Sequence, residues 1–189
     1  MKKLDNILDR NPLKLNLGCY NKKIGNFVNI DVRPEVNPDL VDDVSKLEKI
    51  ENGSVDYIYI SHCLEHFTHW QALQALNRYK EVLKPGGLLR IAVPDIQAAM
   101  IYYQETGNLQ DIKTMMIGSQ LHEFDHHYNV WDFASLKKDL NMVGFIGVKR
   151  YDWRDTEHWY IDDYSQSYLP HMDKVNGRLM SLNVEARKL

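Results

Sequence analysis

Five short apolar segments, each followed by or ending in a glycine, proline or polar residue, constrain the fold of this chain most strongly. They are KLNLG at 14–18, FVNID at 27–31, DLVDD at 39–43, SVDYIYIS at 54–61 and LLRIAV at 88–93. SVDYIYIS is rich in branched and aromatic residues and nearly free of charge, which is typical of buried strands in a parallel sheet, and LLRIAV is expected to be another buried strand. In such sheets, ligands bind at the carboxyl ends of the strands.

Helical patterns lie between and after these strands. Thr68 and Gln71 fit a capping box for a helix that ends at the LKPGG sequence. Its apolar positions are Trp70, Leu73, Leu76, Tyr79 and Leu83. A second helix is expected from Asp132 to about Met142, one or two within 96–130, and a short one over 3–10. The segments FIGVKRY (145–151) and RLMSLNVEA (178–186) are expected to form two late strands.

These elements predict a single α/β domain, residues 1–189, with a mostly parallel sheet and an antiparallel hairpin at one edge. Only residues 19–26 and 32–38 separate the first three strands, whereas a parallel crossover usually needs a dozen residues or more. We therefore expect loops in place of the early crossover helices, which leaves one face of the sheet thinly covered. The N-terminal helix or a second copy of the chain would cover it, so a homodimer is expected.

Composition limits which binding partners and which cellular compartment are expected for this chain. The net charge of −3 gives no reason to expect nucleic acid. The two cysteines are too few for a disulfide framework, which favours a reducing compartment. The N-terminal MKKLDNILDRNP lacks the apolar core of a signal peptide, and no apolar run is long enough for a membrane span. A cytoplasmic protein without membrane contact is expected.

The motifs LNLGC, VNID, DDVSKL, SVDYIYISHCLEHF and LKPGGLLRIAVPD, in this order, resemble those of class I S-adenosylmethionine-dependent methyltransferases. With HYNVWDFASLKKDLNMVGF and SLNVEARK, the chain is most similar to a compact "predicted methyltransferase" branch often associated with polysaccharide or lipopolysaccharide biosynthesis. The resemblance implies a Rossmann-like fold that binds S-adenosyl-L-methionine within residues 13–95. It also implies acceptor-side insertions at 96–130 and 152–177.

Two strand-end residues are candidates for cofactor contact on chemical grounds. Gly18 lacks a Cβ and lets the backbone approach a ligand, although a plain turn also explains it. The Asp31 carboxylate can accept hydrogen bonds from both hydroxyls of a ribose, or it is simply solvated.

The resemblance implies further cofactor residues. It assigns the loop Gly18–Cys19–Tyr20 to the cofactor, although many family members have more glycines where this chain has Cys19 and Tyr20. Tyr20 then either covers the cofactor or fills its place. Asp43 corresponds to the position that binds the adenine amino group, with the Val44 amide facing the ring. Asp42 would take this adenine-binding role instead of Asp43 if the strand register slips by one residue. The resemblance also implies that Ser61 and His62 line the methionine moiety.

Histidines and acids gather in two places that invite a catalytic or metal-binding interpretation. One is HCLEH at 62–66, which lacks the spacing of the H-E-x-x-H zinc motif, and the other is 122–127. No metal is expected. A histidine could remove the acceptor proton, since its pKa near 6.5 suits this task, or could be structural. The resemblance favours His66 in this role, with His127 next, and Asp95 could assist.

The function expected from these features is methyl transfer to a small polar acceptor, such as a hydroxyl of a sugar or glycan precursor. Trp153, Trp159 and Tyr164 either stack on such an acceptor or pack within a surface loop. Two alternatives stay open. One is a non-catalytic domain that binds a partner protein or a nucleotide-like ligand, and the other is a metal hydrolase that uses residues 122–127.

Overall fold

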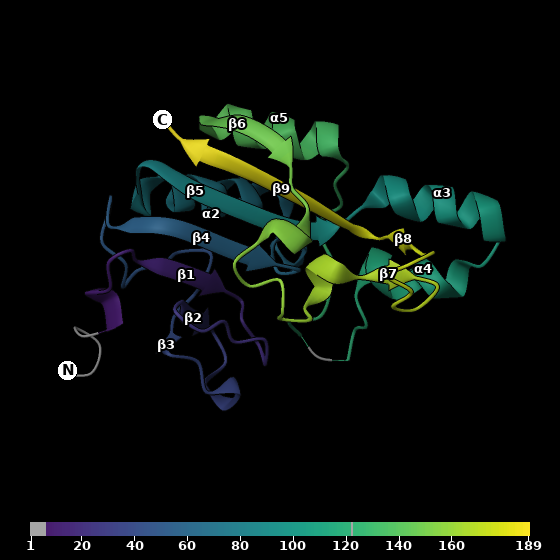
Figure 1. Ribbon diagram of the computed structural model, residues 1–189, viewed down its shortest axis with the longest axis horizontal. Coiled ribbons are helices and arrows are strands. Elements are labelled where there is room, and N and C mark those ends of the chain that lie inside the picture. The colour runs from purple at the N-terminus through teal and green to yellow at the C-terminus, as the bar shows by residue number, and fades with distance from the viewer. Residues whose placement is uncertain (1–6, 122) are drawn as a thin grey trace.

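A seven-stranded sheet forms the centre of the computed structural model, which describes residues 7–121 and 123–189 (Figure 1). The strand order is β3-β2-β1-β4-β5-β9-β6. The strands are β1 (Lys14–Leu17), β2 (Val28–Asp31), β3 (Leu40–Val41), β4 (Val55–Ser61), β5 (Leu83–Pro94), β6 (Phe145–Arg150) and β9 (Ser181–Lys188). β9 runs antiparallel to β5 and β6, and the pairs from β3 to β5 are parallel. The expected α/β sheet with an antiparallel pair at one edge is confirmed.

Four α-helices that lie wholly within the described residues, and several short elements, accompany the sheet. They are α2 (His69–Val82), α3 (Ile96–Thr106), α4 (Leu109–Ile117), α5 (Phe133–Val143), the 3-10 turns η1 (Pro34–Val36), η2 (Leu64–His66), η3 (Trp153–Asp155) and η4 (Tyr164–Gln166), and the hairpin β7 (Tyr168–Leu169) with β8 (Arg178–Leu179). Residues 3–6 of the helix expected over 3–10 lie outside the described residues, and residues 7 and 8 are helical. Among the described helices, none combines the length and the apolar character that crossing a membrane requires.

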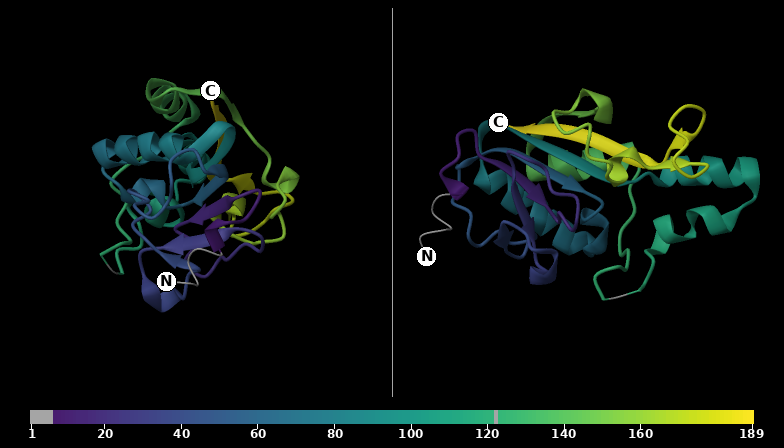
Figure 2. Two further views of the ribbon diagram at one scale, coloured as in Figure 1. Left: turned by 90° about the vertical axis from the view of Figure 1, so that its left-hand side faces the viewer. Right: turned by 60° about the horizontal axis from the view of Figure 1, so that its bottom comes forward.

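Capping boxes define the two helices that pack on the sheet. The Gln71 amide donates to the Thr68 hydroxyl, and the Thr68 amide donates to Gln71 Oε1 at 3.0 Å. Asp132 and Ser135 make the same reciprocal pair at the start of α5. Each cap satisfies amides that have no partner within the helix. α2 and α5 cover one face of the sheet and bury its main apolar core (Figure 2, left).

The opposite face is covered by residues 152–169, in yellow-green in Figure 2. The early crossovers are short as expected, because η1 is the only helical turn among residues 18–39. In place of helices, His158 packs against Phe27 and Tyr59, with ring centroids 5.7 and 4.2 Å away. The Tyr59 hydroxyl also donates to Asp163 at 2.6 Å. This segment covers the face for which a second copy was expected, so the stated reason for a homodimer no longer applies.

Three features of these elements differ from the expected ones. α2 ends at Val82, so Leu83 begins β5, and the pairing of β4 with β5 shifts register across the LKPGG sequence. Trp70 is 68% exposed, because the buried face of α2 is Ala72, Ala75, Leu76, Tyr79 and Val82. The last expected strand is divided at Met180, whose amide donates to the Ser167 carbonyl and whose carbonyl accepts from the Asp95 amide.

Candidate functional site

The residues expected in the site lie along the carboxyl edge of the parallel strands. Gly18 follows β1, Asp31 ends β2, Ser61 ends β4, and Asp95 follows β5. The turn after β3 carries Asp42, Asp43 and Val44, and η2 after β4 carries His66. The candidate His127 reaches the same edge from the connection between α4 and α5. His122 lies outside the described residues.

The loop after β1 is in direct contact with the loop after β4. Gly18 has a φ of 64°, and its amide donates to the Ile30 carbonyl at 2.9 Å. A Cβ on Gly18 would lie 2.6 Å from Cys63 Sγ, which is closer than real Cβ atoms approach. Both the backbone angle and this contact require glycine here. The neighbouring Cys19 is buried, and burial raises the pKa of its thiol to about 12, so it stays protonated.

Asp31 forms the polar centre of the β1–β2 edge. Its buried carboxylate accepts hydrogen bonds from the Tyr20 amide at 2.9 Å and the Arg33 amide at 3.0 Å. The Arg33 side chain adds a longer contact of 3.3 Å and lies over the Tyr20 ring, 4.8 Å from its centroid. A carboxylate has about four acceptor positions, so these three contacts leave capacity for another donor.

The turn after β3 distinguishes the two rival aspartates. Asp42 is buried, and its carboxylate accepts from the amides of Asp43 and Lys49. Asp43 is 40% exposed at its side chain and accepts from the Ser45 hydroxyl at 2.6 Å and from Lys46 at 3.1 Å. Burial opposes ionisation of Asp43, but these contacts outweigh it and lower its pKa. Asp43 therefore presents an ionised carboxylate near the surface, whereas Asp42 holds the turn together.

Burial controls the charge of the groups that follow β4. Burial raises the pKa of Glu65 to about 8 and lowers the pKa of His62 to about 3. The 3.4 Å contact between His62 Nδ1 and Glu65 Oε1 therefore joins two neutral groups at pH 7. His62 Nε2 also lies 3.0 Å from Ser181 Oγ. The buried Ser61 hydroxyl has no hydrogen-bond partner among the described residues.

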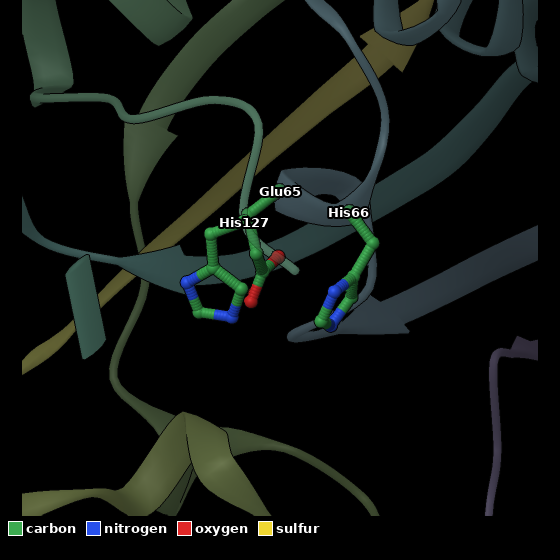
Figure 3. Close-up of side chains that lie close together, drawn as sticks. All are labelled: Glu65, His66 and His127. Carbon is green, nitrogen blue, oxygen red and sulfur yellow. The ribbon is translucent and has the colours of Figure 1, made fainter. Parts of the chain in front are cut away.

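His66 and His127 face each other beside Glu65 (Figure 3). Their ring centroids are 4.8 Å apart, and His66 Nδ1 lies 3.1 Å from the His126 carbonyl oxygen. His127 Nδ1 lies 2.9 Å from the Met115 carbonyl oxygen. Burial and the neighbouring His66 lower the pKa of His127, so its ring is neutral at neutral pH. The structure thus brings together the two histidines expected as bases, and adds Glu65, which strand-end reasoning does not identify.

The Asp95 carboxylate is engaged on both oxygens. Oδ1 accepts from the Gln97 amide at 3.0 Å and so caps α3. Oδ2 accepts from Arg150 on β6 at 3.1 Å. These contacts tie the end of β5 to α3 and to the edge strand.

The aromatic residues of 152–170 separate into buried and exposed ones. Trp153 is 8% exposed and donates to the Tyr168 hydroxyl at 3.3 Å, so it is not available to stack on an acceptor. Trp159 and Tyr164 are each 58% exposed. The Tyr164 ring centroid lies 5.4 Å from that of His62, which places Tyr164 at the candidate site.

Comparisons with known proteins agree with this architecture. Residues 15–149 match a family model described as "Methyltransferase domain". No curated protein sequence matches the chain. Similar solved structures are SAM-dependent methyltransferases from three organisms.

The structure from Archaeoglobus fulgidus has a TM-score of 0.59 at 14% identity, with 99% of this chain and 90% of that chain covered. The structure from Methanosarcina mazei has a TM-score of 0.60 at 15% identity, with 98% of this chain and 96% of that chain covered. The structure from Thermotoga maritima has a TM-score of 0.62 at 10% identity, with 100% of this chain and 87% of that chain covered. At these identities the structural matches show a shared fold. The family model spans most of the chain, and the chain belongs to the methyltransferase domain family.

Proposed function

We propose that this chain transfers a methyl group from S-adenosyl-L-methionine to a hydroxyl of a small polar acceptor, such as a sugar or glycan precursor. The observation that carries the proposal is Asp31, a buried carboxylate at the carboxyl end of β2 with remaining acceptor capacity. Family membership supports the reaction class. The acceptor class rests on the sequence resemblance.

The residues at the edge have the chemistry that this cofactor needs. Asp31 would accept from a ribose hydroxyl, and Gly18, which has no side chain, would present backbone to the ligand. Asp43 would accept from the adenine amino group beside Val44. Ser61 and His62 would lie beside the methionine moiety at the end of β4, where the buried Ser61 hydroxyl has no hydrogen-bond partner among the described residues. Cys19 and Tyr20 would contribute backbone and ring surface.

When bound, S-adenosylmethionine supplies an electrophilic methyl group on a sulfonium centre. The chain contributes chiefly by holding the acceptor oxygen in line, because orientation lowers the barrier by removing translational and rotational freedom beforehand. Donation from Nδ1 to the Met115 carbonyl places the basic lone pair of neutral His127 on Nε2. This nitrogen, or that of His66, receives the proton released by the acceptor hydroxyl as the new oxygen–carbon bond forms.

We assign Asp95 a positioning role in this mechanism. Because it caps α3 and pairs with Arg150, it fixes the insertion that follows β5 rather than exchanging protons. Tyr164, exposed beside His62, provides a ring face for the acceptor.

Calorimetry with S-adenosylhomocysteine tests the cofactor part of the proposal. We expect the wild-type chain to bind and Asp31→Ala to bind at least about tenfold more weakly, since a hydrogen bond to a charged group contributes roughly 1.5–3 kcal/mol. Asp9→Ala removes an exposed carboxylate elsewhere and serves as the matched control. Absence of binding by the wild type at millimolar ligand would favour the non-catalytic alternative. Equal affinity of Asp31→Ala and wild type would exclude the ribose contact.

A further inference from the structure

Glu65, His66 and His127, named here the Glu65–His66–His127 cluster, converge from two separate segments. Glu65 and His66 belong to η2, directly after β4, and His127 belongs to the connection between α4 and α5. One potential ligand atom from each residue lies within 4.8 Å of the other two. The side chains point toward one another (Figure 3).

Backbone hydrogen bonds hold these two segments together at the cluster. The Glu65 carbonyl oxygen accepts from the Tyr128 amide at 2.9 Å and from the Asn129 amide at 3.3 Å. The residue next to His127 is therefore bonded directly to the residue that bears the carboxyl group. The three side chains are held close before any ligand arrives, which reduces the entropic cost of binding.

The Glu65 carboxyl group is buried beside His62, whose Nδ1 lies 3.4 Å from Oε1 without forming a hydrogen bond. Its side chain is 0% exposed, and neither oxygen has a hydrogen-bond partner among the residues that the structure describes. Burying a polar group without a partner costs free energy, so such groups in folded proteins are normally bonded or bound to an ion. A cation between Glu65 and the imidazoles would supply the missing partner.

The imidazoles are oriented as metal-binding histidines commonly are. Each has Nδ1 at hydrogen-bond distance from a backbone carbonyl, that of His126 for His66 and that of Met115 for His127. Metal-ligating histidines usually donate one ring N–H to a carbonyl or carboxylate, which orients the ring and places the lone pair on the other nitrogen. For both residues that nitrogen is Nε2.

We propose that Glu65, His66 and His127 bind a divalent first-row transition-metal ion. Two imidazoles and one carboxylate suit ions such as Zn²⁺, Fe²⁺ and Co²⁺ better than Mg²⁺ or Ca²⁺, which prefer oxygen ligands. In tetrahedral geometry, ligand distances of about 2.1 Å place two ligand atoms about 3.4 Å apart. The ligand atoms of the cluster lie within 4.8 Å of one another, so the side chains would close by at most about 1.4 Å around the ion.

Three protein ligands leave further coordination positions open to water or to an acceptor oxygen. An acceptor hydroxyl bound to the ion would have a lowered pKa and would release its proton to solvent water, so that neither imidazole would need to act as the base. This consequence rests on the proposed methyl transfer, whereas metal binding by the cluster does not.

Titration of chelator-treated full-length chain with Co²⁺, followed by visible absorption and by elemental analysis, tests the site. We expect one Co²⁺ per chain and a loss of affinity of at least about tenfold in Glu65→Gln and in His127→Gln. His171→Gln, which removes an exposed histidine outside the cluster, should bind as the wild type does. Circular dichroism of each variant reports its folding, and His66→Gln provides an independent third ligand variant.

Absence of stoichiometric Co²⁺ binding by the wild type would overturn the proposal. So would folded cluster variants that bind as tightly as the wild type, or an equal loss in His171→Gln. Calorimetry with S-adenosylhomocysteine on the same metal-free protein keeps the two proposals separate, because cofactor binding through Asp31 does not depend on the ion.

Discussion

Gly18 meets two independent constraints, one from its backbone and one from its neighbour. Its φ of 64° lies in the left-handed region, and Cys63 Sγ occupies the space that a Cβ would need. Gly53 shares the first constraint, with a φ of 65°, but nothing lies within 4 Å of its hypothetical Cβ. The two glycines therefore allow the backbone and packing contributions to be measured separately.

We expect Gly53→Ala to lower the free energy of unfolding by about 1–2 kcal/mol, the cost of a left-handed non-glycine residue. Gly18→Ala should cost at least about 1 kcal/mol more, because the added methyl group overpacks against Cys63. Urea denaturation of both variants measures the difference. Equal losses would show that the Cys63 contact carries no energetic cost.

Glu65 should make stability depend on pH. Burial raises its pKa in the folded chain from 4.5 to about 8, so the folded state keeps a proton that the unfolded state has released. The free energy of unfolding therefore falls as pH rises between these values, by up to about 1.4 kcal/mol per pH unit. Glu65→Gln carries no titrating proton, so it should gain stability relative to the wild type across this window.

Denaturant unfolding of both proteins from pH 5 to 8, in chelating buffer, measures this effect. His62 and His158 have pKa values lowered by burial, to about 3 and about 4, and they favour the folded state as pH rises toward 6.5. Both residues are present in both proteins, so the contribution of His158 cancels, and the comparison reports Glu65 together with His62, which lies 3.4 Å from it. Parallel curves for the wild type and Glu65→Gln would contradict a protonated buried carboxyl group.

At the residue scale, candidate site residues can be predicted where they end a recognisable strand, and the fold brings these residues to one edge of the sheet. Asp31 and Gly18 can be selected because each ends a recognisable strand, and parallel strands share one carboxyl edge. Glu65 cannot be selected in this way. Its burial depends on the connection between α4 and α5, which binds the Glu65 carbonyl from more than 60 residues further along the chain.

At the scale of elements, residues 152–169 cover the face of the sheet that crossover helices would otherwise cover. Tyr57 and Tyr59 point to the face opposite α2, and both would be exposed without His158 and Asp163 above them. The segment has no helical or strand period, because it consists mainly of turns and two isolated 3-10 turns, with His158 between them and Asp163 capping the second. Its role was therefore not predictable from periodicity, whereas α5 was, because Asp132 and Gly144 mark its ends.

Tyr59→Phe should weaken the packing of residues 152–169 on the sheet. The change removes the 2.6 Å hydrogen bond to the buried Asp163 carboxyl group and should cost about 1–3 kcal/mol. Hydrogen exchange of the amides in 152–169 should then become faster than in the wild type. Tyr57→Phe is the matched control, because the Tyr57 hydroxyl has only a 3.5 Å contact with Arg90. The same acceleration in both variants would show that the Asp163 bond does not hold the segment.

At the scale of the whole molecule, the order of motifs predicts the fold class better than it predicts the arrangement of layers. Strand positions follow from apolar runs and turn residues, and a parallel α/β sheet follows from their alternation with helices. The place of β9 between β5 and β6 depends instead on long-range pairing. The covering of the sheet face opposite α2 and α5 likewise depends on packing between segments that are distant in the sequence, and short-range sequence patterns do not predict it.

The central claim is that the carboxyl edge of the sheet binds S-adenosylmethionine through Asp31, and a crystal structure with S-adenosylhomocysteine tests it most directly. We predict ribose hydroxyls at hydrogen-bond distance from the Asp31 carboxylate, with the adenine between Val44 and the Asp43 carboxylate. A ligand bound away from this edge, or an edge without ligand in crystals grown at saturating S-adenosylhomocysteine, would contradict the account.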